Sequence, residues 1–282
     1  MNIYQKLKLS MLSTNESIIR DAILKDPFQF ASLTPAKISD EYHISRATLY
    51  RLCDKLELKG FHDLKVRLLS DYDSYQDSVK AFDFDYPVQS GASVHQTALK
   101  LQEDYTLSMQ MTVNLINYNV LPSVAMLMKK ASVIDIYASA GNIYFAENFA
   151  FQMRETGKNV FVPEEEYLQR LTAAGADSEH FAIVISFGGR GLLAEHVCRT
   201  LRNNHCRFLL ISSKQAENII AFSDYQLYMP ESEHHSDKIS SFSTRFSLLY
   251  LLDLLYTAYF NLDYDENIRK KNEYYRQISA KK

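Results

Sequence analysis

Apolar residues recur at helical spacing over residues 3–71, in several short stretches that each begin with a residue suited to start a helix. Ser13 is followed three residues later by Glu16, which is a capping-box pattern, and the helix that it starts must end before Pro27. The pattern predicts an all-α N-terminal region built from short, individually capped helices.

Three of these predicted helices follow one another closely. Thr34 offers a hydroxyl cap to a helix that runs to about Glu41, Ser45 can cap a helix over Arg46–Leu56, and another follows over Phe61–Leu69. Two short helices joined by a tight turn are the plan of a helix-turn-helix, whose second helix reads the major groove of DNA. An apolar stripe would hold the pair together: Ile38, Ile44, Leu49, Leu52, Cys53 and Leu56.

The polar face of the helix that begins at Arg46 carries the candidate DNA contacts. Hydroxyls and free N–H groups at a helix start can hold a phosphate oxygen, and side chains in the first turns can reach base edges. The alternative is a capped helical hairpin with a solvated face, because residues 37–67 hold seven basic and five acidic side chains. The candidates are Thr34, Ser45, Arg46, Thr48, Tyr50, Arg51, Lys55, Lys59 and Lys65.

The composition changes between Ser70 and Gly91, where aspartates alternate with tyrosines and phenylalanines before Pro87. We interpret residues 76–92 as a linker between a helix-turn-helix domain over residues 1–75 and a second domain over residues 93–282.

Beyond the linker, a long helical pattern over Ser93–Asn117 leads into short apolar runs that alternate with helices. Runs that are apolar on both faces and separated by helices are typical of a parallel sheet covered on both sides. We therefore expect an α/β domain with five parallel strands between two helical layers. The expected strands are Val133–Ala138, Asn159–Val162, Ala182–Ser186, Arg207–Ile211 and Tyr225–Met229.

Ligands of open parallel sheets bind where the carboxyl ends of the strands turn into helices. The loops at these points are rich in small and hydroxyl-bearing residues, whose backbone N–H groups can approach an anion. The candidate effector contacts are Ser139, Asn142, Ser186, Gly188, Gly189, Arg190, Gly191 and Ser213. After the last strand, a second group of polar residues could hydrogen-bond to a sugar, but we favour a solvated polar loop for them: Glu231, Glu233, His234 and His235.

Composition and charge exclude several other classes of protein. The net charge of −3 excludes a uniformly basic DNA-coating protein, so any DNA-binding surface must be local. The first ten residues lack the apolar core of a secretory signal, and the apolar run Phe246–Phe260 contains a serine and an aspartate, so we expect a cytoplasmic protein without a membrane segment. The three cysteines show no metal-ligand spacing, and we expect no metal, no cofactor and no catalytic residue.

The N-terminal motifs resemble the helix-turn-helix of the RpiR/MurR family of bacterial transcription regulators. The resemblance covers roughly the first seventy residues and rests on Ser45-Arg46-Ala47-Thr48, Arg51-Leu52-Cys53 and Gly60-Phe61. The family tends to carry a small hydroxyl residue at the position of Tyr50 and often a proline at the position of Arg46. These two departures affect which DNA sequence is recognised, and not whether DNA is bound. The resemblance implies binding to double-stranded DNA.

The residues from about Leu121 to Leu262 resemble the SIS (sugar isomerase) domain that follows the helix-turn-helix in the same regulators. This resemblance implies a phosphosugar effector from carbohydrate metabolism. Two family glycines are replaced by Ala138 and Ala140, Asn142 stands at a hydroxyl position, and Gly188 and Gly191 replace two further hydroxyls. The pocket could still hold an anion through N–H groups and Arg190, or the domain could serve only as a dimerisation scaffold.

The function we expect is a homodimeric regulator, with a tetramer left open, whose two reading helices lie about 34 Å apart on a palindromic operator. The first alternative is a DNA-binding scaffold without an effector. The second is a phosphosugar isomerase, which would need a base beside the substrate; Glu147 is the only residue we would consider for it.

Overall fold

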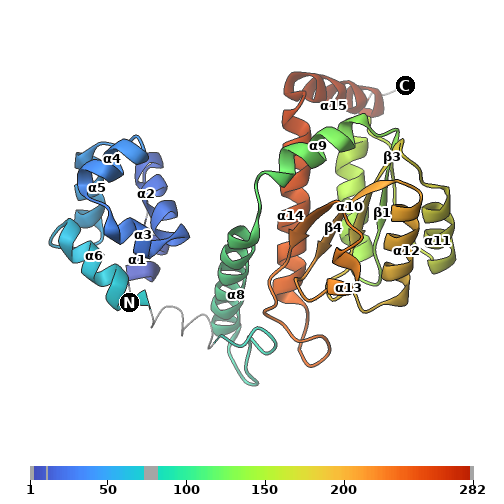
Figure 1. The fold of residues 1–282 in the computed structure, drawn as a ribbon. Coiled ribbons are helices and arrows are strands. Elements are labelled where there is room, and N and C mark those ends of the chain that lie inside the picture. The colour runs from blue at the N-terminus through green and yellow to red at the C-terminus, as the bar shows by residue number, and fades with distance from the viewer. Residues whose placement is uncertain (1–2, 11, 73–81, 280–282) are drawn as a thin grey trace. The chain divides into compact units, whose positions relative to one another are not determined.

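The computed structural model describes residues 3–10, 12–72 and 82–279, and it divides the chain into two compact units, Met1–Asp83 and Phe84–Lys282 (Figure 1). The expected linker, residues 76–92, spans this division. Residues 76–81 lie outside the described part of the chain, and residues 84–92 belong to the second unit.

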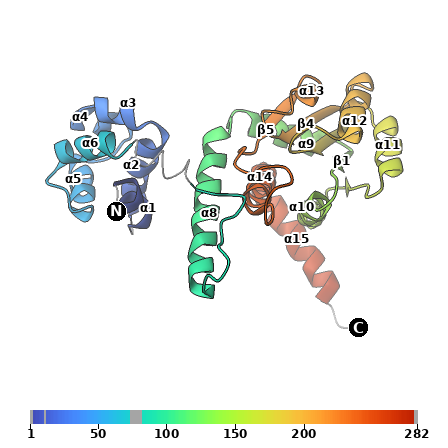
Figure 2. The same cartoon turned by 90° about the horizontal axis from the view of Figure 1, so that it is seen from below.

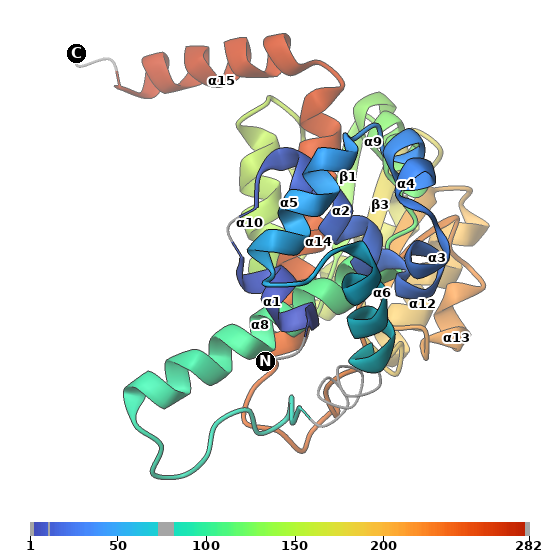
Figure 3. The ribbon, with the colours of Figure 1, turned by 90° about the vertical axis from the view of Figure 1, so that its left-hand side faces the viewer.

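Helices are the only regular secondary structure among the described residues of the first unit (Figure 3). One side chain from most turns points into a single apolar core, which contains the expected stripe from Ile38 to Leu56 together with Leu64 and Leu68. The all-α expectation for this region is therefore confirmed. The helices are α1 (Ile3–Leu9), α2 (Thr14–Lys25), α3 (Pro27–Ser32), α4 (Pro35–Glu41), α5 (Arg46–Lys55) and α6 (Phe61–Ser70).

Side chains start these helices as the sequence predicts. The Ser45 hydroxyl accepts a hydrogen bond from Thr48 N at 3.1 Å, and the Thr34 hydroxyl accepts one from Lys37 N at 3.3 Å. Helix α3 was not expected, because Pro27 was interpreted only as the end of α2. Asp26 accepts a hydrogen bond from Gln29 N at 2.8 Å, and Pro27 needs no donor at the first helical position, so the same proline also begins a helix.

The second unit contains a five-stranded, fully parallel sheet in the order β2-β1-β3-β4-β5, which confirms the expected fold class. The strands are β1 (Val133–Tyr137), β2 (Val160–Phe161), β3 (His180–Ile185), β4 (Arg207–Ser212) and β5 (Tyr225–Tyr228). The helices are α8 (Val94–Leu115), α9 (Val120–Lys130), α10 (Asn142–Arg154), α11 (Glu166–Gly175), α12 (Leu192–Asn203), α13 (Glu217–Ile220), α14 (Phe242–Asn261) and α15 (Tyr264–Ser279).

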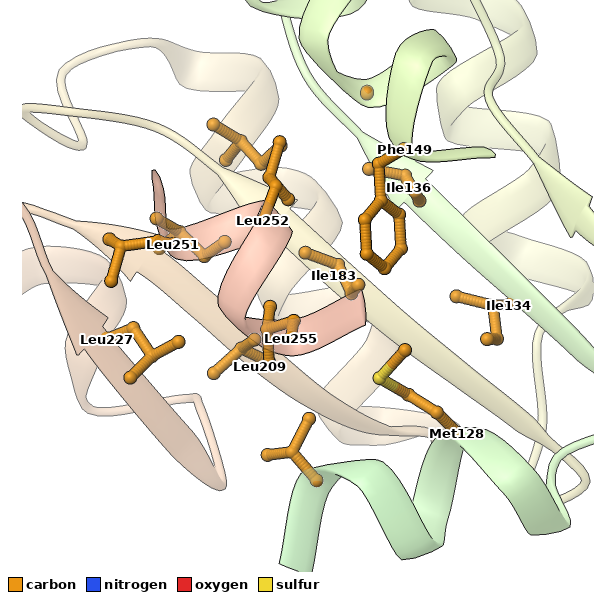
Figure 4. Packing of buried hydrophobic residues seen from close by; sticks show 14 of the residues in the cluster. Met128, Ile134, Ile136, Phe149, Ile183, Leu209, Leu227, Leu251, Leu252 and Leu255 are labelled. Atoms are coloured by element: carbon orange, nitrogen blue, oxygen red, sulfur yellow. The ribbon is translucent and has the colours of Figure 1, made fainter. Parts of the chain in front are cut away.

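Helices cover both faces of the sheet (Figures 1 and 2). On one face, alternate strand residues such as Ile183 and Leu209 pack against α9, α10 and α14, with Phe149 and Leu252 among the contacts (Figure 4). On the other face, Val184 and its neighbours pack against α11, α12 and α13. Because both faces are buried, the strands read as continuous apolar runs.

The contact between α8 and α14 is unusual because it contains buried polar groups. Ser108 donates a hydrogen bond to Ser243 at 2.7 Å, and Thr112 donates one to Ser247 at 2.8 Å. Asp104 is fully buried beside them, and its Oδ2 atom has no hydrogen-bond partner within the described residues. Burial raises the pKa of Asp104 to about 6, so at neutral pH the folded protein carries a poorly solvated charge here.

We predict that Asp104→Asn stabilises the second unit at pH 8. The pKa of Asp104 is higher in the folded than in the unfolded chain, so its ionisation destabilises the fold increasingly as the pH rises from about 4 to 6. Removing the charge should contribute about 1–3 kcal/mol at pH 8 and little near pH 4. Urea denaturation of the full chain at both pH values measures this difference, and a gain that is equal at both would contradict the assignment.

Candidate functional sites

The first candidate site is the exposed face of α5 at its leading end. Arg46, Tyr50 and Arg51 are all exposed on this face. The Arg51 guanidinium donates to Ala47 O at 3.4 Å and to the Thr48 hydroxyl at 3.3 Å, which directs it along the helix. Neither arginine forms an ion pair with any carboxylate in the described part of the chain, so both charges are available to an external anion.

Two of the expected DNA contacts have internal partners instead. Thr48 is only 3% exposed, and its hydroxyl lies 2.9 Å from the Ser45 hydroxyl, so it supports the helix cap and does not face solvent. Lys55 donates to Glu16 Oε2 at 2.6 Å and thereby joins α5 to α2. Burial alone would raise the pKa of Glu16, but the hydrogen bonds from Lys55 and Ser13 outweigh it, and the pKa is lowered.

The remaining expected contacts flank α5 in the sequence and in the fold. Thr34 is exposed at the start of α4, and Lys59 is exposed in the connection between α5 and α6. Lys65 is half-buried on α6, with its ammonium 4.9 Å from the centre of the Phe61 ring. The Lys59 and Lys65 ammonium groups therefore follow the helix-turn-helix, and both side chains are at least partly exposed to solvent.

The second candidate site is the edge of the sheet where the carboxyl ends of β1, β3 and β4 lie side by side. Strands β1 and β3 are neighbours although α10, β2 and α11 lie between them in the sequence, so this is the point where the strand order reverses. Ligands of doubly wound sheets bind at such a point. The structure places Ser139, Arg190 and Gly191 exposed at this edge, with Asn142, Ser186 and Gly188 half-buried.

Two expected effector contacts, Gly189 and Ser213, are buried and form hydrogen bonds within the chain. Gly189 has a φ of +64°, and its carbonyl accepts a hydrogen bond from Asn218 at 2.8 Å; a Cβ atom here would lie 2.7 Å from Asn218 Oδ1. Ser213 is 1% exposed, and its hydroxyl accepts a hydrogen bond from Gln215 N at 3.2 Å. The Ser213 hydroxyl is therefore not available to a ligand in this arrangement.

The charge at this edge is mixed. Arg190 folds back over Gly188 and has no ion-pair partner within the described residues, so its guanidinium is free to meet an anion. The first turn of α12 also contains Glu195, which pairs with Arg199 at 2.7 Å and reduces the positive potential of that helix end. The edge can therefore hold an anion through Arg190 and backbone N–H groups, with less help from hydroxyls than the family motif supplies.

Of the acidic and histidine residues after β5, Glu233 is buried, whereas Glu231, His234 and His235 are exposed, as in a solvated loop. Glu231 accepts two hydrogen bonds from Gln215, at 3.0 and 2.9 Å. The Glu233 side chain is fully buried and accepts hydrogen bonds from Ser243 N and from the Thr244 hydroxyl at the start of α14.

A cavity of about 210 Å³ lies at the opposite edge of the sheet, where β1, β3 and β4 begin. Lys130, Glu179, His180 and Arg207 line it, and the His180 ring lies 2.7 Å from a carboxylate oxygen of buried Asp135. Burial raises the pKa of Asp135, although the His180 hydrogen bond opposes this effect. Helix α9 ends here, and helix C-termini present carbonyl oxygens that disfavour a bound anion.

Comparison with known families identifies both domains. Residues 1–75 match the model of the helix-turn-helix domain of the rpiR family, and residues 127–258 match that of the SIS domain. The chain combines an rpiR-family helix-turn-helix domain with a SIS domain. The resemblance expected from the motifs of both halves is thereby confirmed.

Proteins similar to this chain include a relative from Haemophilus influenzae described as an uncharacterized HTH-type transcriptional regulator. It is 24% identical over 248 residues, which cover 87% of this chain and 84% of the relative. The Vibrio vulnificus NanR protein, solved in complex with ManNAc-6P, superposes with a TM-score of 0.60 at 16% identity over 99% of this chain and 100% of NanR.

Solved structures also resemble the SIS domain alone. The sugar isomerase domain of an RpiR transcription factor from Sphaerobacter thermophilus has a TM-score of 0.57 at 10% identity, covering 64% of this chain and 99% of that structure. A putative sugar-phosphate isomerase from Listeria monocytogenes has a TM-score of 0.54 at 9% identity, covering 67% of this chain and 99% of that structure. At these identities the likeness establishes the fold alone. Within the described ranges, no helix is long and apolar enough to span a bilayer.

We predict that Lys55→Ala destabilises the helix-turn-helix domain by about 1 kcal/mol. The substitution leaves the carboxylate of Glu16 buried without its ammonium partner, although the half-exposed position of Lys55 limits the cost. Thermal unfolding of the full chain at pH 7 measures the loss. Lys59→Ala, which removes an exposed ammonium outside any described ion pair, is the matched control and should leave stability unchanged.

A second prediction concerns the glycines of the β3–α12 loop. Gly189→Ala should destabilise the SIS domain by more than about 1 kcal/mol, because alanine is strained at a φ of +64° and its Cβ would collide with Asn218. Gly191→Ala should have little effect, since that position is open and its φ is −78°. Equal unfolding temperatures for the two variants would show that Gly189 is not tightly packed.

Proposed function

We propose that this chain is a cytoplasmic transcription regulator whose helix-turn-helix domain binds double-stranded DNA and whose SIS domain binds a phosphosugar or a related anion. The observation that carries the proposal is the leading end of α5, which is capped by Ser45 and exposes Arg46 and Arg51 without internal carboxylate partners. An arginine held in this way can donate two parallel hydrogen bonds to guanine, and the cap fixes the helix start against the phosphate backbone.

The proposed DNA target is a palindrome that a homodimer reads, and a tetramer formed from two such dimers is left open. Two copies of α5 about 34 Å apart would enter successive major grooves on one face of the duplex. Thr34, Lys59 and Lys65 would contact the phosphate backbone of the DNA. Lys55 is not among the proposed contacts, because its ammonium forms an ion pair with Glu16. The H. influenzae relative, described as a transcriptional regulator, supports this assignment.

The proposed effector site is the sheet edge formed by Ser139, Asn142, Ser186 and Arg190. The reversal of strand order and the unpaired Arg190 support an anionic ligand there, and NanR, which shares the fold, was solved with ManNAc-6P. A DNA-binding scaffold without an effector is the second candidate. The buried positions of Gly189 and Ser213, together with the missing family hydroxyls, favour that alternative.

We propose no enzymatic activity for the SIS domain, although SIS proteins include isomerases. Glu147, the one candidate base, lies 3.6 Å from Arg154 in an ion pair on α10, so Arg154 competes with a sugar for its carboxylate. Turnover of hexose or pentose phosphates that is lost in Glu147→Gln would contradict this assignment.

We predict that Arg51→Ala and Lys65→Ala weaken DNA binding in different ways. Loss of a base contact by Arg51 should cost about 1–3 kcal/mol and relax the preference for one base, whereas loss of a phosphate contact by Lys65 should weaken all sequences alike. Lys65→Ala should also reduce the slope of log affinity against log salt by about one unit. Arg170→Ala on α11 is the control, and parent-like binding by both test variants would refute the placement of α5.

We predict that a sugar phosphate raises the unfolding temperature of the full chain. A ligand present at a hundredfold its Kd stabilises the fold by about 2.7 kcal/mol. ManNAc-6P, other hexosamine and hexose phosphates, and inorganic phosphate form the test panel, and Arg190→Ala should reduce any shift. If no member shifts the parent, the scaffold alternative is correct.

A further inference from the structure

The loop between β5 and α14, residues 229–241, contacts three separate parts of the second unit. The sequence offered its acidic and histidine residues as possible sugar contacts, but the Glu231, Glu233 and His234 side chains form hydrogen bonds within the chain. Glu231, Glu233 and His234, whose side chains or backbone make these contacts, lie within four consecutive residues. Movement at one contact is therefore hard to separate from movement at the others.

The first contact joins the loop to the proposed effector edge. Glu231 accepts hydrogen bonds from Gln215 N at 3.0 Å and from Gln215 Nε2 at 2.9 Å. Gln215 N also donates to the Ser213 hydroxyl, and Ser213 N donates to Phe187 O in the loop that carries Arg190. A change in either of these two strand-end loops thus reaches Glu231 through direct hydrogen bonds.

The second contact anchors the middle of the loop to the start of α14. Glu233 is buried and accepts hydrogen bonds from Ser243 N at 2.5 Å and from the Thr244 hydroxyl at 2.7 Å, and Lys238 donates to it at 3.0 Å. Ser232 lies 2.7 Å from the Ser243 hydroxyl. These bonds hold the loop as a rigid turn, which is the condition for it to transmit a displacement.

The third contact holds the segment that leads from the helix-turn-helix domain into the SIS domain. Asp85 lies two residues after the boundary between the two units, and only 8% of it is exposed. Its carboxylate accepts a hydrogen bond from His234 N at 2.7 Å and pairs with the His234 ring, and its carbonyl accepts one from Ile239 N at 2.9 Å. Tyr86 donates a further hydrogen bond to Asp237.

We propose that the β5–α14 loop couples the effector edge to the segment around Asp85 that follows the domain boundary. In this coupling Glu231 responds to a ligand at the edge, and the contacts of Asp85 change as a result. The proposal rests on the proposed function, because it describes how an anion at the edge would influence DNA binding. A ligand that displaces Gln215 alters its bonds to Glu231, and the rigid turn carries that change to the His234 and Ile239 bonds of Asp85. Coupling of this kind is reciprocal, so loss of the Asp85 contacts must also weaken the hydrogen bonds of Gln215.

The first test measures the coupling on the full chain without ligand or DNA. Chymotrypsin cleaves after Phe84, which is buried in the parent, so the rate of that cleavage, followed by mass spectrometry, reports release of the segment. Asp85→Ala sets the rate for a released segment. Glu231→Ala should raise the rate after Phe84 by at least about fivefold, because it removes two hydrogen bonds and the factor expected for one is about five. Glu217→Ala, an exposed carboxylate two residues after Gln215, is the matched control and should match the parent.

The reverse direction is measured by amide hydrogen exchange at Gln215, whose N–H is protected by Ser213 and Glu231. Asp85→Ala should accelerate this exchange by a similar factor. Parent-like cleavage in Glu231→Ala, or parent-like exchange at Gln215 in Asp85→Ala, overturns the coupling even if both variants fold normally by circular dichroism. Failure of the parent to bind any DNA would instead overturn the proposed function and leave these two results to decide the coupling.

Discussion

The parallel pairing of β1 with β3 is the constraint on which the SIS domain depends. These strands are far apart in the sequence, and their alignment brings the loops after β1, β3 and β4 to one edge of the sheet. Both faces are then covered by helices, so polar groups can gather only at the strand ends or along helix contacts. The effector edge, the Glu231 contact and the start of α14 all lie at the carboxyl end because of this pairing.

In both domains, polar side chains in partly or fully buried positions define where elements meet. Glu16 and Lys55 join α2 to α5 and so fix the helix that exposes Arg46 and Arg51. Glu233 fixes the start of α14, while Asp104 lies between α8 and α14 with one oxygen unpartnered in the described structure. Such groups contribute little net stability, but they restrict the arrangements that the apolar core alone would permit. A regulator needs restricted arrangements, because a ligand can act only by favouring one over another.

Sequence patterns predicted most of the fold, because its signals are local. Thr34 and Ser45 cap helices through bonds three residues away, and apolar runs mark the five strands. The site was predicted less completely, since burial depends on contacts that are distant in sequence. Lys55 pairs with a residue 39 positions away, Gly189 packs against α13, and Asp85 meets a histidine 149 positions away. No periodicity or spacing reports these pairings, although the capping pattern did indicate that Glu16 faces the helix start.

The most direct test of the central claim is selection of fragments of the organism's own genome that bind the full chain, followed by sequencing. A helix whose arginines read base edges predicts a small set of enriched fragments that share one inverted repeat, with half-sites about 10 base pairs apart or at a multiple of that spacing. The same selection with Arg46 and Arg51 both replaced by alanine should lose that repeat. No enrichment by the parent, or the same repeat recovered by the double variant, would contradict the account.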